Sequence, residues 1–108
     1  MANSFKNYFL KNANTTSQNV YVAGAGVSAT VIGMTIGNTT AAPITANISV
    51  TSATVAYTML LNATIATGGA LVPVGGDQKL VLEAGDFIQV QTSAANSADV
   101  IVSVLEIT

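Results

Sequence analysis

Residues 43–52, PITANISVTS, indicate the fold class of this chain. Four apolar residues alternate here with four polar ones, with a period of two. Successive side chains of a β-strand point to opposite faces, so this period predicts a strand with one face on a core and the other in solvent. The apolar set is Ile44, Ala46, Ile48 and Val50, and the polar set is Thr45, Asn47, Ser49 and Thr51.

Similar strand patterns lie on both sides of this segment, separated by turn sequences rich in Gly, Asn and Ser. About eight strands at intervals of about 8 to 12 residues, without a helical period, are typical of a sandwich or barrel. We therefore predict an all-β fold: a single-domain antiparallel β-sandwich, jelly-roll-like, with about eight strands and an N-terminal arm. The last segment is apolar on both faces, which indicates a central strand or one covered by a neighbouring subunit. The expected strands are residues 20–23, 30–36, 43–52, 55–61, 70–74, 79–82, 87–92 and 100–107.

Residues 1–18 differ in character from the sandwich domain expected for residues 19–108. They are either a first strand or an arm lying on a neighbour, followed by a polar connector. Two of the three phenylalanines and one of the three tyrosines lie here, and leaving them in water would be costly. These rings either close one end of the domain's own core or dock on another subunit. The candidate contact residues, toward a subunit or a shell, are Phe5, Tyr8, Phe9 and Leu10.

Charged residues make up only 7% of the chain, and residues 12–76 contain no Asp, Glu, Lys, Arg or His. An ordinary domain is about a quarter charged. Nucleic-acid binding needs clustered Lys or Arg, and this chain has three lysines and no arginine, so no nucleic-acid partner is expected. The lack of cysteine excludes disulfides and thiolate metal sites. Function is therefore expected in surfaces rather than in reactive groups.

Motifs that suggest chemistry have simpler structural explanations. Residues 24–29, GAGVSA, match a dinucleotide-binding pattern, but a strand pattern follows instead of the required helix, and no acid comes before Asp77. Glu83 and Asp86 bracket a turn, and with Asp77 and Asp99 they are too loosely spaced for a carboxylate pair or a Ca²⁺ site. A serine nucleophile would lack a histidine base. We expect no catalytic, cofactor-binding or metal-binding residues.

Residues 54–76 are uncharged, as the residues of a membrane span would be. Polar residues recur within them, and Gly68, Gly69 and Pro73 interrupt them, whereas a spanning helix needs about 20 predominantly apolar residues. No membrane partner is expected. Residues 1–11 also lack the apolar core of a secretory signal, so cytoplasmic synthesis without processing is expected.

Two segments carry a family resemblance: residues 30–38, TVIGMTIGN, and residues 71–107, LVPVGGDQKLVLEAGDFIQVQTSAANSADVIVSVLEI. They resemble short β-rich virion proteins of tailed bacteriophages, including phages of marine bacteria and cyanobacteria. The resemblance covers about residues 18–107 and lies in turn-and-strand motifs such as GGDQK and LEAGD. It implies a particle component without catalytic residues, most simply a capsid decoration or cement protein that stabilises the shell by non-covalent contacts. The implied location is the virion, after synthesis in the cytoplasm of a bacterial host, and the implied partners are the major capsid protein or other virion proteins.

Self-association is a second expectation. Exposed strand edges are usually protected from aggregation by charge, especially by lysine. A sheet protein with such a long uncharged stretch lacks that protection, so copies of the chain or a larger surface are expected to cover some of its edges and faces. A homotrimer docked where capsomers meet is the favoured arrangement.

Other functions remain open at this point. The protein could occupy the neck, tail or a fibre of the particle instead of the head. A receptor- or glycan-binding β-module is an alternative of another class, although Tyr21 and Tyr57 lie in strand patterns that predict burial rather than stacking on a sugar. Enzyme activity is not expected, because it would have to depend on the few acids alone.

Overall fold

The computed structural model describes residues 3–75 and 79–108, and these residues form nine β-strands. Within the described ranges no helix occurs, and therefore none long and apolar enough to cross a membrane. The strands are β1 (Asn3–Ala13), β2 (Gln18–Val22), β3 (Ser28–Asn38), β4 (Ile44–Ser52), β5 (Val55–Ile65), β6 (Ala70–Val74), β7 (Leu80–Leu82), β8 (Phe87–Thr92) and β9 (Ala98–Ile107).

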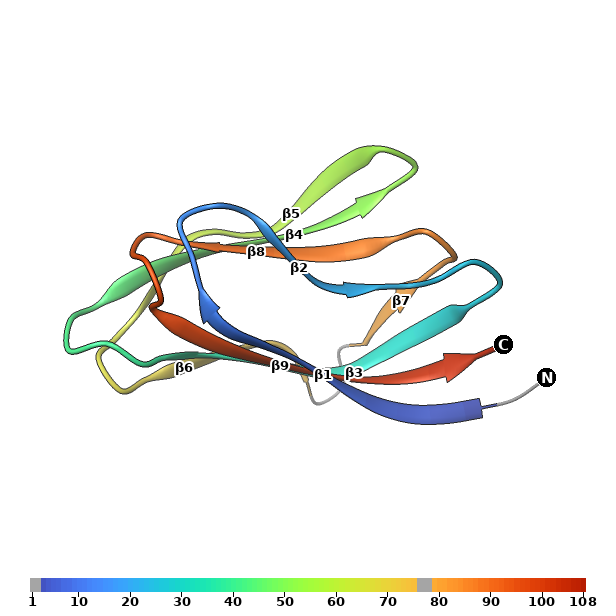
Figure 1. Ribbon diagram of the computed structural model, residues 1–108, viewed down its shortest axis with the longest axis horizontal. Helices are drawn as coiled ribbons and strands as arrows, with labels where there is room; N and C mark the ends of the chain where they lie inside the picture. Colours follow the sequence, from blue (N-terminus) through green and yellow to red (C-terminus); the bar gives the residue numbers. More distant parts are fainter. Residues whose placement is uncertain (1–2, 76–78) are drawn as a thin grey trace.

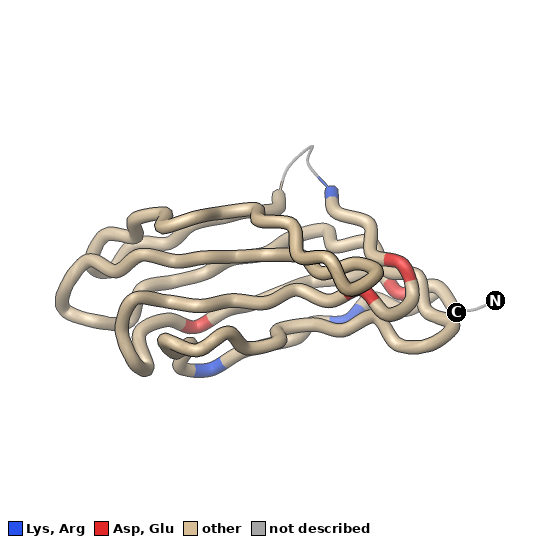
Figure 2. Tube along the Cα trace, turned by 90° about the horizontal axis from the view of Figure 1, so that it is seen from above, with Lys and Arg blue, Asp and Glu red and all other residues tan. Residues whose placement is uncertain are grey.

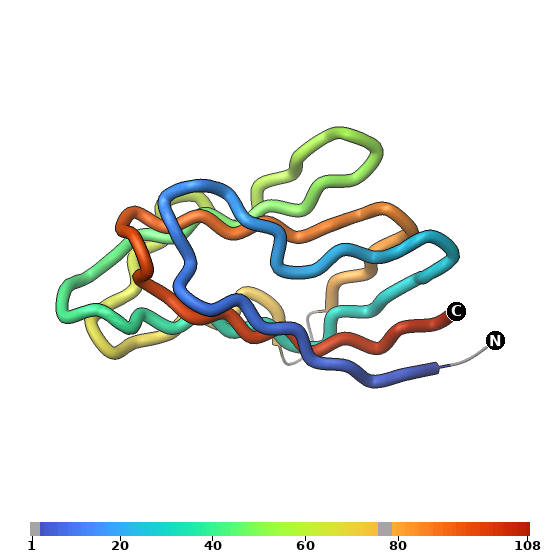
Figure 3. The backbone as a smooth tube through the Cα atoms, viewed as in Figure 1, coloured from blue at the N-terminus to red at the C-terminus, as the bar shows by residue number. Residues whose placement is uncertain are grey.

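The strands form two antiparallel sheets that pack face to face (Figure 1). One has the order β1-β9-β3-β6, with β7 also paired to β3, and the other has the order β2-β8-β4-β5. The chain passes repeatedly from one sheet to the other, as in a jelly roll (Figure 3). The predicted antiparallel β-sandwich is confirmed.

The structure adds one strand to the expected eight, and two of the expected strands share one position in the sheet. β6 pairs with Met34–Gly37 of β3, and β7 pairs with Ala29–Val31 of the same strand. Residues 70–74 and 79–82 were predicted as two separate strands. Both exist, and together they fill one strand position beside β3. Residues 3–13 add a strand, because β1 pairs with β9 along most of its length. Of the two roles considered for the N-terminal segment, the structure shows the first strand.

The core lies between the sheets and is made by alternate residues of each strand. In β9, which lies between β1 and β3, the inward set is Val100, Val102 and Val104. In β4 the inward set is the apolar one predicted from its period of two. β-Branched side chains suit this pleated, half-buried surface. The largest fully buried side chains are Met34, Ile36, Ile48, Ile65, Leu82, Ile88, Val31, Val74, Val90, Val100, Val102 and Val104.

The β4–β5 hairpin departs from the predicted burial. Tyr21 is buried as expected, but the expectation for Tyr57 was wrong, because its side chain is 59% exposed. Tyr57 pairs with Val50 near the tip of the hairpin, which projects away from the rest of the sandwich (Figure 1). The opposite sheet does not cover this tip, so an inward-facing position there still meets solvent.

Two turns agree with their predicted structural role. The Val27 amide donates to the Gly24 carbonyl, which closes a turn, and β3 follows it where a dinucleotide site would need a helix. In the next turn the Glu83 amide donates to Oδ2 of Asp86, and the Asp86 amide donates to the Glu83 carbonyl. Asp77, the third acid considered there, lies outside the described residues.

Candidate functional site

The outer surface of the β1-β9-β3-β6 sheet carries a group of exposed apolar side chains, and register places them in rows. Phe5 of β1 lies opposite Leu105 of β9, and Phe9 lies opposite Ile101. Thr30 continues the first row on β3, next to Val81 of β7. We call Phe5, Phe9, Val81, Ile101 and Leu105 the apolar face.

The two phenylalanines of the apolar face are unusually open to solvent. Phe5 is 76% exposed and Phe9 is 68% exposed, and Val81 and Ile101 are exposed as well. Asn7 and Ser103 lie between the row of Phe5 and the row of Phe9, so no charged residue separates the two rows. Scattered apolar residues are normal on a protein surface, but apolar residues grouped on one sheet make a candidate interaction surface.

The outer surface of the other sheet has the opposite character. Asn19 lies opposite Gln89, which lies opposite Ser49, and Gln91 lies opposite Asn47. The Gln89 side chain donates from Nε2 to Oδ1 of Asn19 at 3.0 Å. We call these five residues the amide face. It is uncharged and rich in hydrogen-bonding groups, and the exposed Leu61 of β5 lies beside it.

A shallow hollow of about 310 Å³ lies on the amide face. Asn47, Ser49, Gln89 and Gln91 line it together with β5 residues that include Thr58. Amide and hydroxyl groups of this kind can bond to sugar hydroxyls, but the lining contains no aromatic ring on which a sugar could stack.

Charged groups are sparse along the described chain (Figure 2). Both lysines of β1 are paired with acids of β9: Lys6 Nζ lies 3.1 Å from Oε1 of Glu106, and Lys11 Nζ lies 2.9 Å from Oδ2 of Asp99. The Asn12 amide also donates to Asp99 at 3.1 Å, and this bond, followed by the one from Lys11, lowers the pKa of Asp99. The two ion pairs connect β1 to β9 near the two ends of β1.

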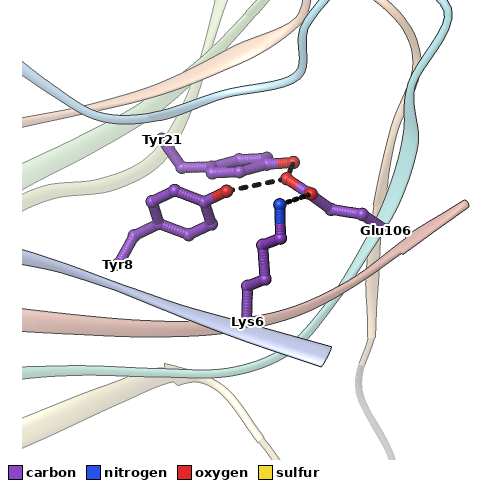
Figure 4. A network of polar contacts seen from close by, with 4 residues as sticks. All are labelled: Lys6, Tyr8, Tyr21 and Glu106. Atoms are coloured by element: carbon purple, nitrogen blue, oxygen red, sulfur yellow. Dashed lines mark hydrogen bonds and ion pairs between the residues drawn. The ribbon is translucent and has the colours of Figure 1, made fainter. Parts of the chain in front are cut away.

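Glu106 lies at the centre of a polar cluster between the sheets (Figure 4). Its Oε2 accepts hydrogen bonds from the hydroxyl of Tyr21 at 2.6 Å and from that of Tyr8 at 2.9 Å, and its Oε1 faces Lys6. The rings of Tyr8 and Tyr21 are in tilted contact, with centroids 4.6 Å apart. We call Lys6, Tyr8, Tyr21 and Glu106 the carboxylate clamp, because it joins β1, β2 and β9.

The carboxylate clamp is built for structure rather than for proton transfer. The hydrogen bond from Tyr21 is the main cause that lowers the pKa of Glu106, and burial is the main cause that raises the pKa of Tyr21. General acid–base catalysis needs pKa values moved toward the working pH. Here the pKa of Glu106 is moved further below neutral pH and the pKa of Tyr21 further above it, so the carboxylate stays charged and the phenol stays protonated.

The structure divides the four candidate contact residues between two environments. Phe5 and Phe9 point outward on the apolar face, whereas Tyr8 and Leu10 pack against the core. The two phenylalanines therefore do not close the domain's own core. Tyr8 and Leu10 do contribute to it, as the alternation along a strand requires.

Two features were missed at the level of the sequence. Glu106 was counted only as a charge, although it shares the inward parity of Val100, Val102 and Val104, and a charge at such a position needs partners. The breadth of the apolar face was missed because it combines β1 with β7 and β9, which only the sheet order brings together. Within the described residues no three acids gather where they could hold a metal ion.

Comparisons with known proteins add a likeness in fold. No family model matches the chain, and no curated protein matches it. A solved structure described as "Bacillus endospore appendages form a novel family of disulfide-linked pili" superposes with a TM-score of 0.58 and 15% sequence identity. The match covers 98% of this chain and 88% of that one. At this identity the likeness concerns the sandwich fold alone.

Proposed function

We propose that this protein is a structural subunit of a bacteriophage particle, a capsid decoration or cement protein held in place by non-covalent contacts. The observation that carries the proposal is the apolar face. The particle and its bacterial host come from the resemblance of residues 30–38 and 71–107 to short virion proteins. The role needs no reactive group and no cofactor, and it is a role in assembly rather than catalysis.

The size of the apolar side suits a protein contact. Where β6 or β7 pairs with β3 the sheet is four strands wide, which is about 19 Å, and its longest strands have 11 residues, which is about 37 Å. The whole outer side of the sheet, polar residues included, therefore measures at most about 700 Å², close to the roughly 800 Å² that each partner buries in a stable interface. Burying Phe5 and Phe9 would contribute about 1.5 to 3 kcal/mol each.

The two-sided character of the sandwich supports a position on a shell. With the apolar face toward the shell or a neighbouring subunit, the amide face would point to solvent. Its amide and hydroxyl groups can hydrogen-bond to water, so the outer surface of the particle would be hydrated although it carries no charge. A homotrimer remains the favoured oligomer, because threefold docking multiplies each weak contact.

A second candidate is a subunit of a tail fibre or another protein filament. The likeness in fold to a protein of disulfide-linked pili favours this candidate. This chain contains no cysteine, so a filament built from it would depend on packing and hydrogen bonds instead of disulfides. Neck and tail positions belong to the same candidate. A glycan-binding module is disfavoured by the lack of aromatic rings in the hollow of the amide face.

Cryo-electron microscopy of purified particles tests the location. We expect density for the sandwich on the outside of the head, with Phe5 and Phe9 turned toward the shell or a sister subunit. Density in the tail or neck would replace the first candidate with the second. A particle that lacks the protein altogether would reject both, and saturable binding on a glycan array would then favour the third.

Sedimentation of the purified protein tests the role of the apolar face. The double variant Phe5→Ser and Phe9→Ser should remain folded and shift toward monomer, because both side chains are outside the core. The matched control is Val55→Ser with Leu61→Ser, two exposed apolar residues of β5 on the other sheet. A wild-type protein that stays monomeric at high concentration would contradict the proposal.

A further inference from the structure

The four sheet edges of this sandwich are protected to different degrees. Among the described strands, the edges are β1, β2, β5 and the position shared by β6 and β7. β2 and β6 are five residues long with a shift in register, and β7 has three residues. β6 also contains Pro73, and β5 has two register shifts and a positive φ at Asn62. Short length, irregular register and proline are the usual defences of an edge.

β1 lacks these defences over most of its length. From Asn3 to Leu10 its register with β9 is continuous, and no proline interrupts it. The first irregularity comes after Leu10, near Asn12, whose φ is 58°. β1 therefore presents one long, regular edge with a single neighbouring strand.

The lysines of β1 do not restore the protection. Lysine guards an edge when its charge would be stranded beside an incoming strand. Lys6 is instead paired with Glu106 and Lys11 with Asp99, and both acids belong to β9, on the far side of β1 from the edge. The charges of this edge are already compensated within the molecule.

We propose that β1 pairs with β1 of a second copy, antiparallel and about a two-fold axis at Asn7. The inference rests on the proposed role as an assembled subunit and names a two-fold contact. In a threefold assembly this contact would join neighbouring trimers, because the subunits of one trimer are not related by a two-fold axis. In this register Asn7 lies opposite Asn7 of the second copy, and Phe5 lies opposite Phe9 of the second copy. Aromatic cross-strand pairs of this kind stabilise antiparallel sheets.

The neighbouring registers are worse. Moving the second copy by two residues in one direction sets Phe5 opposite Asn7 and Phe9 opposite Asn3, so the aromatic pairs are lost. Moving it by two in the other direction sets Phe5 opposite Lys11 and separates the aromatic pairs. A shift of one residue would place outward side chains opposite inward ones. The register centred on Asn7 is therefore the one that the sequence of β1 favours.

A second copy fits this edge better than an unrelated strand, because the edge is complementary to itself. A two-fold contact uses the same patch on both subunits, and β1 offers one phenylalanine on each side of Asn7. Pairing also joins the two apolar faces into one continuous surface with four phenylalanines in its middle. That surface, doubled in width, would be presented to the shell or to further subunits.

Single cysteines test the register, since the chain has no cysteine of its own. In Asn7→Cys the two Cα atoms would lie about 4.5 to 5.5 Å apart, within reach of a disulfide. The matched control Ser103→Cys lies beside Asn7 on β9, also on the outward side. Its two copies would be three strand spacings apart, about 14 Å, which is too far. We expect mild oxidation to convert Asn7→Cys, but not Ser103→Cys, to the mass of a dimer.

A mixture of two variants gives an independent test. Phe5→Cys and Phe9→Cys should each stay monomeric on a non-reducing gel and should cross-link only when mixed, because each position lies opposite the other. Equal cross-linking of Asn7→Cys and Ser103→Cys would indicate stacking of faces and would overturn the inference.

Sedimentation separates the failure of this inference from the failure of the proposed function. Oligomers in solution without cross-linking of Asn7→Cys, and without cross-linking in the mixture, would reject only the β1 contact. A protein that is monomeric at every concentration would reject the β1 contact together with the proposed role.

Discussion

One carboxylate, that of Glu106, organises the end of the sandwich where β1, β2 and β9 meet. Its side chain is almost wholly buried, and each of its oxygens has a partner in Tyr8, Tyr21 or Lys6. A buried charge is tolerated when it is paired and hydrogen-bonded, and it becomes costly when one partner is removed. The carboxylate clamp therefore stabilises the fold only while it is complete.

Removing the hydroxyl of Tyr21 tests the clamp directly. We expect Tyr21→Phe to lower the free energy of unfolding by about 1 to 3 kcal/mol, because the Glu106 carboxylate loses its shortest hydrogen bond. Urea denaturation of the variant and the wild type measures the difference. Tyr57→Phe is the matched control, since Tyr57 is exposed and should change stability by less than about 0.5 kcal/mol. Equal losses in both variants would show that the clamp does not contribute.

Acid should weaken the fold through the same carboxylate. The folded-state pKa of Glu106 lies below its ordinary value of 4.5, so the charged form stabilises the fold above pH 4.5. This contribution is lost as the pH falls from 4.5 through the folded-state pKa. Urea denaturation between pH 6 and pH 3 should therefore show a shallower fall in stability for Glu106→Gln than for the wild type.

The control for the acid prediction is Glu83→Gln, in an exposed turn. This variant removes one acid outside the carboxylate clamp and so measures the general effect of losing a negative charge. Asp99, whose pKa is also lowered, should account for part of the fall in stability with pH that remains in Glu106→Gln. An unchanged slope in Glu106→Gln would contradict the prediction.

At the level of single residues, alternation in the sequence predicted orientation well and burial less well. The parity of β9 is enough to turn Glu106 inward, so its need for partners could have been inferred. Tyr57 shows the limit, because parity says which side a residue takes but not whether another layer covers that side. For the same reason, the sequence could not decide whether Phe5 and Phe9 lie in the domain's own core or are exposed for contact with another subunit.

At the scale of elements, the β4–β5 hairpin contains an unusual turn. Ala53 and Thr54 connect the strands, with φ angles of 50° and 67°. Two residues with positive φ form a type I′ turn, for which Asn-Gly is preferred, and a β-branched residue is strained there. Separate strands were expected on either side of this point, but Ala-Thr carries none of the usual turn signals.

Replacing the turn with Asn-Gly should stabilise the hairpin. We expect Ala53→Asn with Thr54→Gly to gain about 1 kcal/mol by relieving the positive φ of two unsuited residues. Hydrogen exchange of the Val55 and Tyr57 amides should slow about fivefold, which corresponds to that free energy. The Val102 and Val104 amides in the central strand should not change. Faster exchange at the tip would contradict the assigned turn.

The elements themselves were largely predictable. Each of the eight predicted segments overlaps a strand, because period-two alternation survives wherever one face of a strand is buried. The role of β1 was not decided by its sequence, since both faces of Ser4 to Leu10 mix aromatic with polar residues. Its pairing with β9 depends on Glu106 and Asp99, which are far from it along the chain.

At the scale of the whole molecule, the two sides of the sandwich predict how assembly responds to solution conditions. The apolar face has no charged member, so screening by salt has little to act on. Sodium chloride between 0.05 and 1 M should leave the association constant nearly unchanged, whereas sulfate should strengthen association by favouring apolar burial. Sedimentation equilibrium measures both effects, and dissociation on adding sodium chloride would indicate a charged interface instead. A reductant should have no effect, because the chain has no cysteine.

The fold class was predicted from patterning, but the two-sided character of the molecule was not. Local alternation says that a strand has an inside and an outside, and the outsides of β1, β7 and β9 become one surface only through their order in the sheet. The particle role came from resemblance, and the structure adds a surface suited to it.

The two ends of the described chain lie at the same end of the molecule, with Asn3 opposite Ile107 (Figure 3). Tension applied through these two residues would peel β1 from β9 one hydrogen bond at a time, with Lys6 and Glu106 among the first contacts to be loaded. Force applied through the sheet surfaces would instead be shared by many bonds at once. In the proposed role on a shell, the protein would therefore resist internal pressure best if load reached each subunit through its flanks and not through its ends.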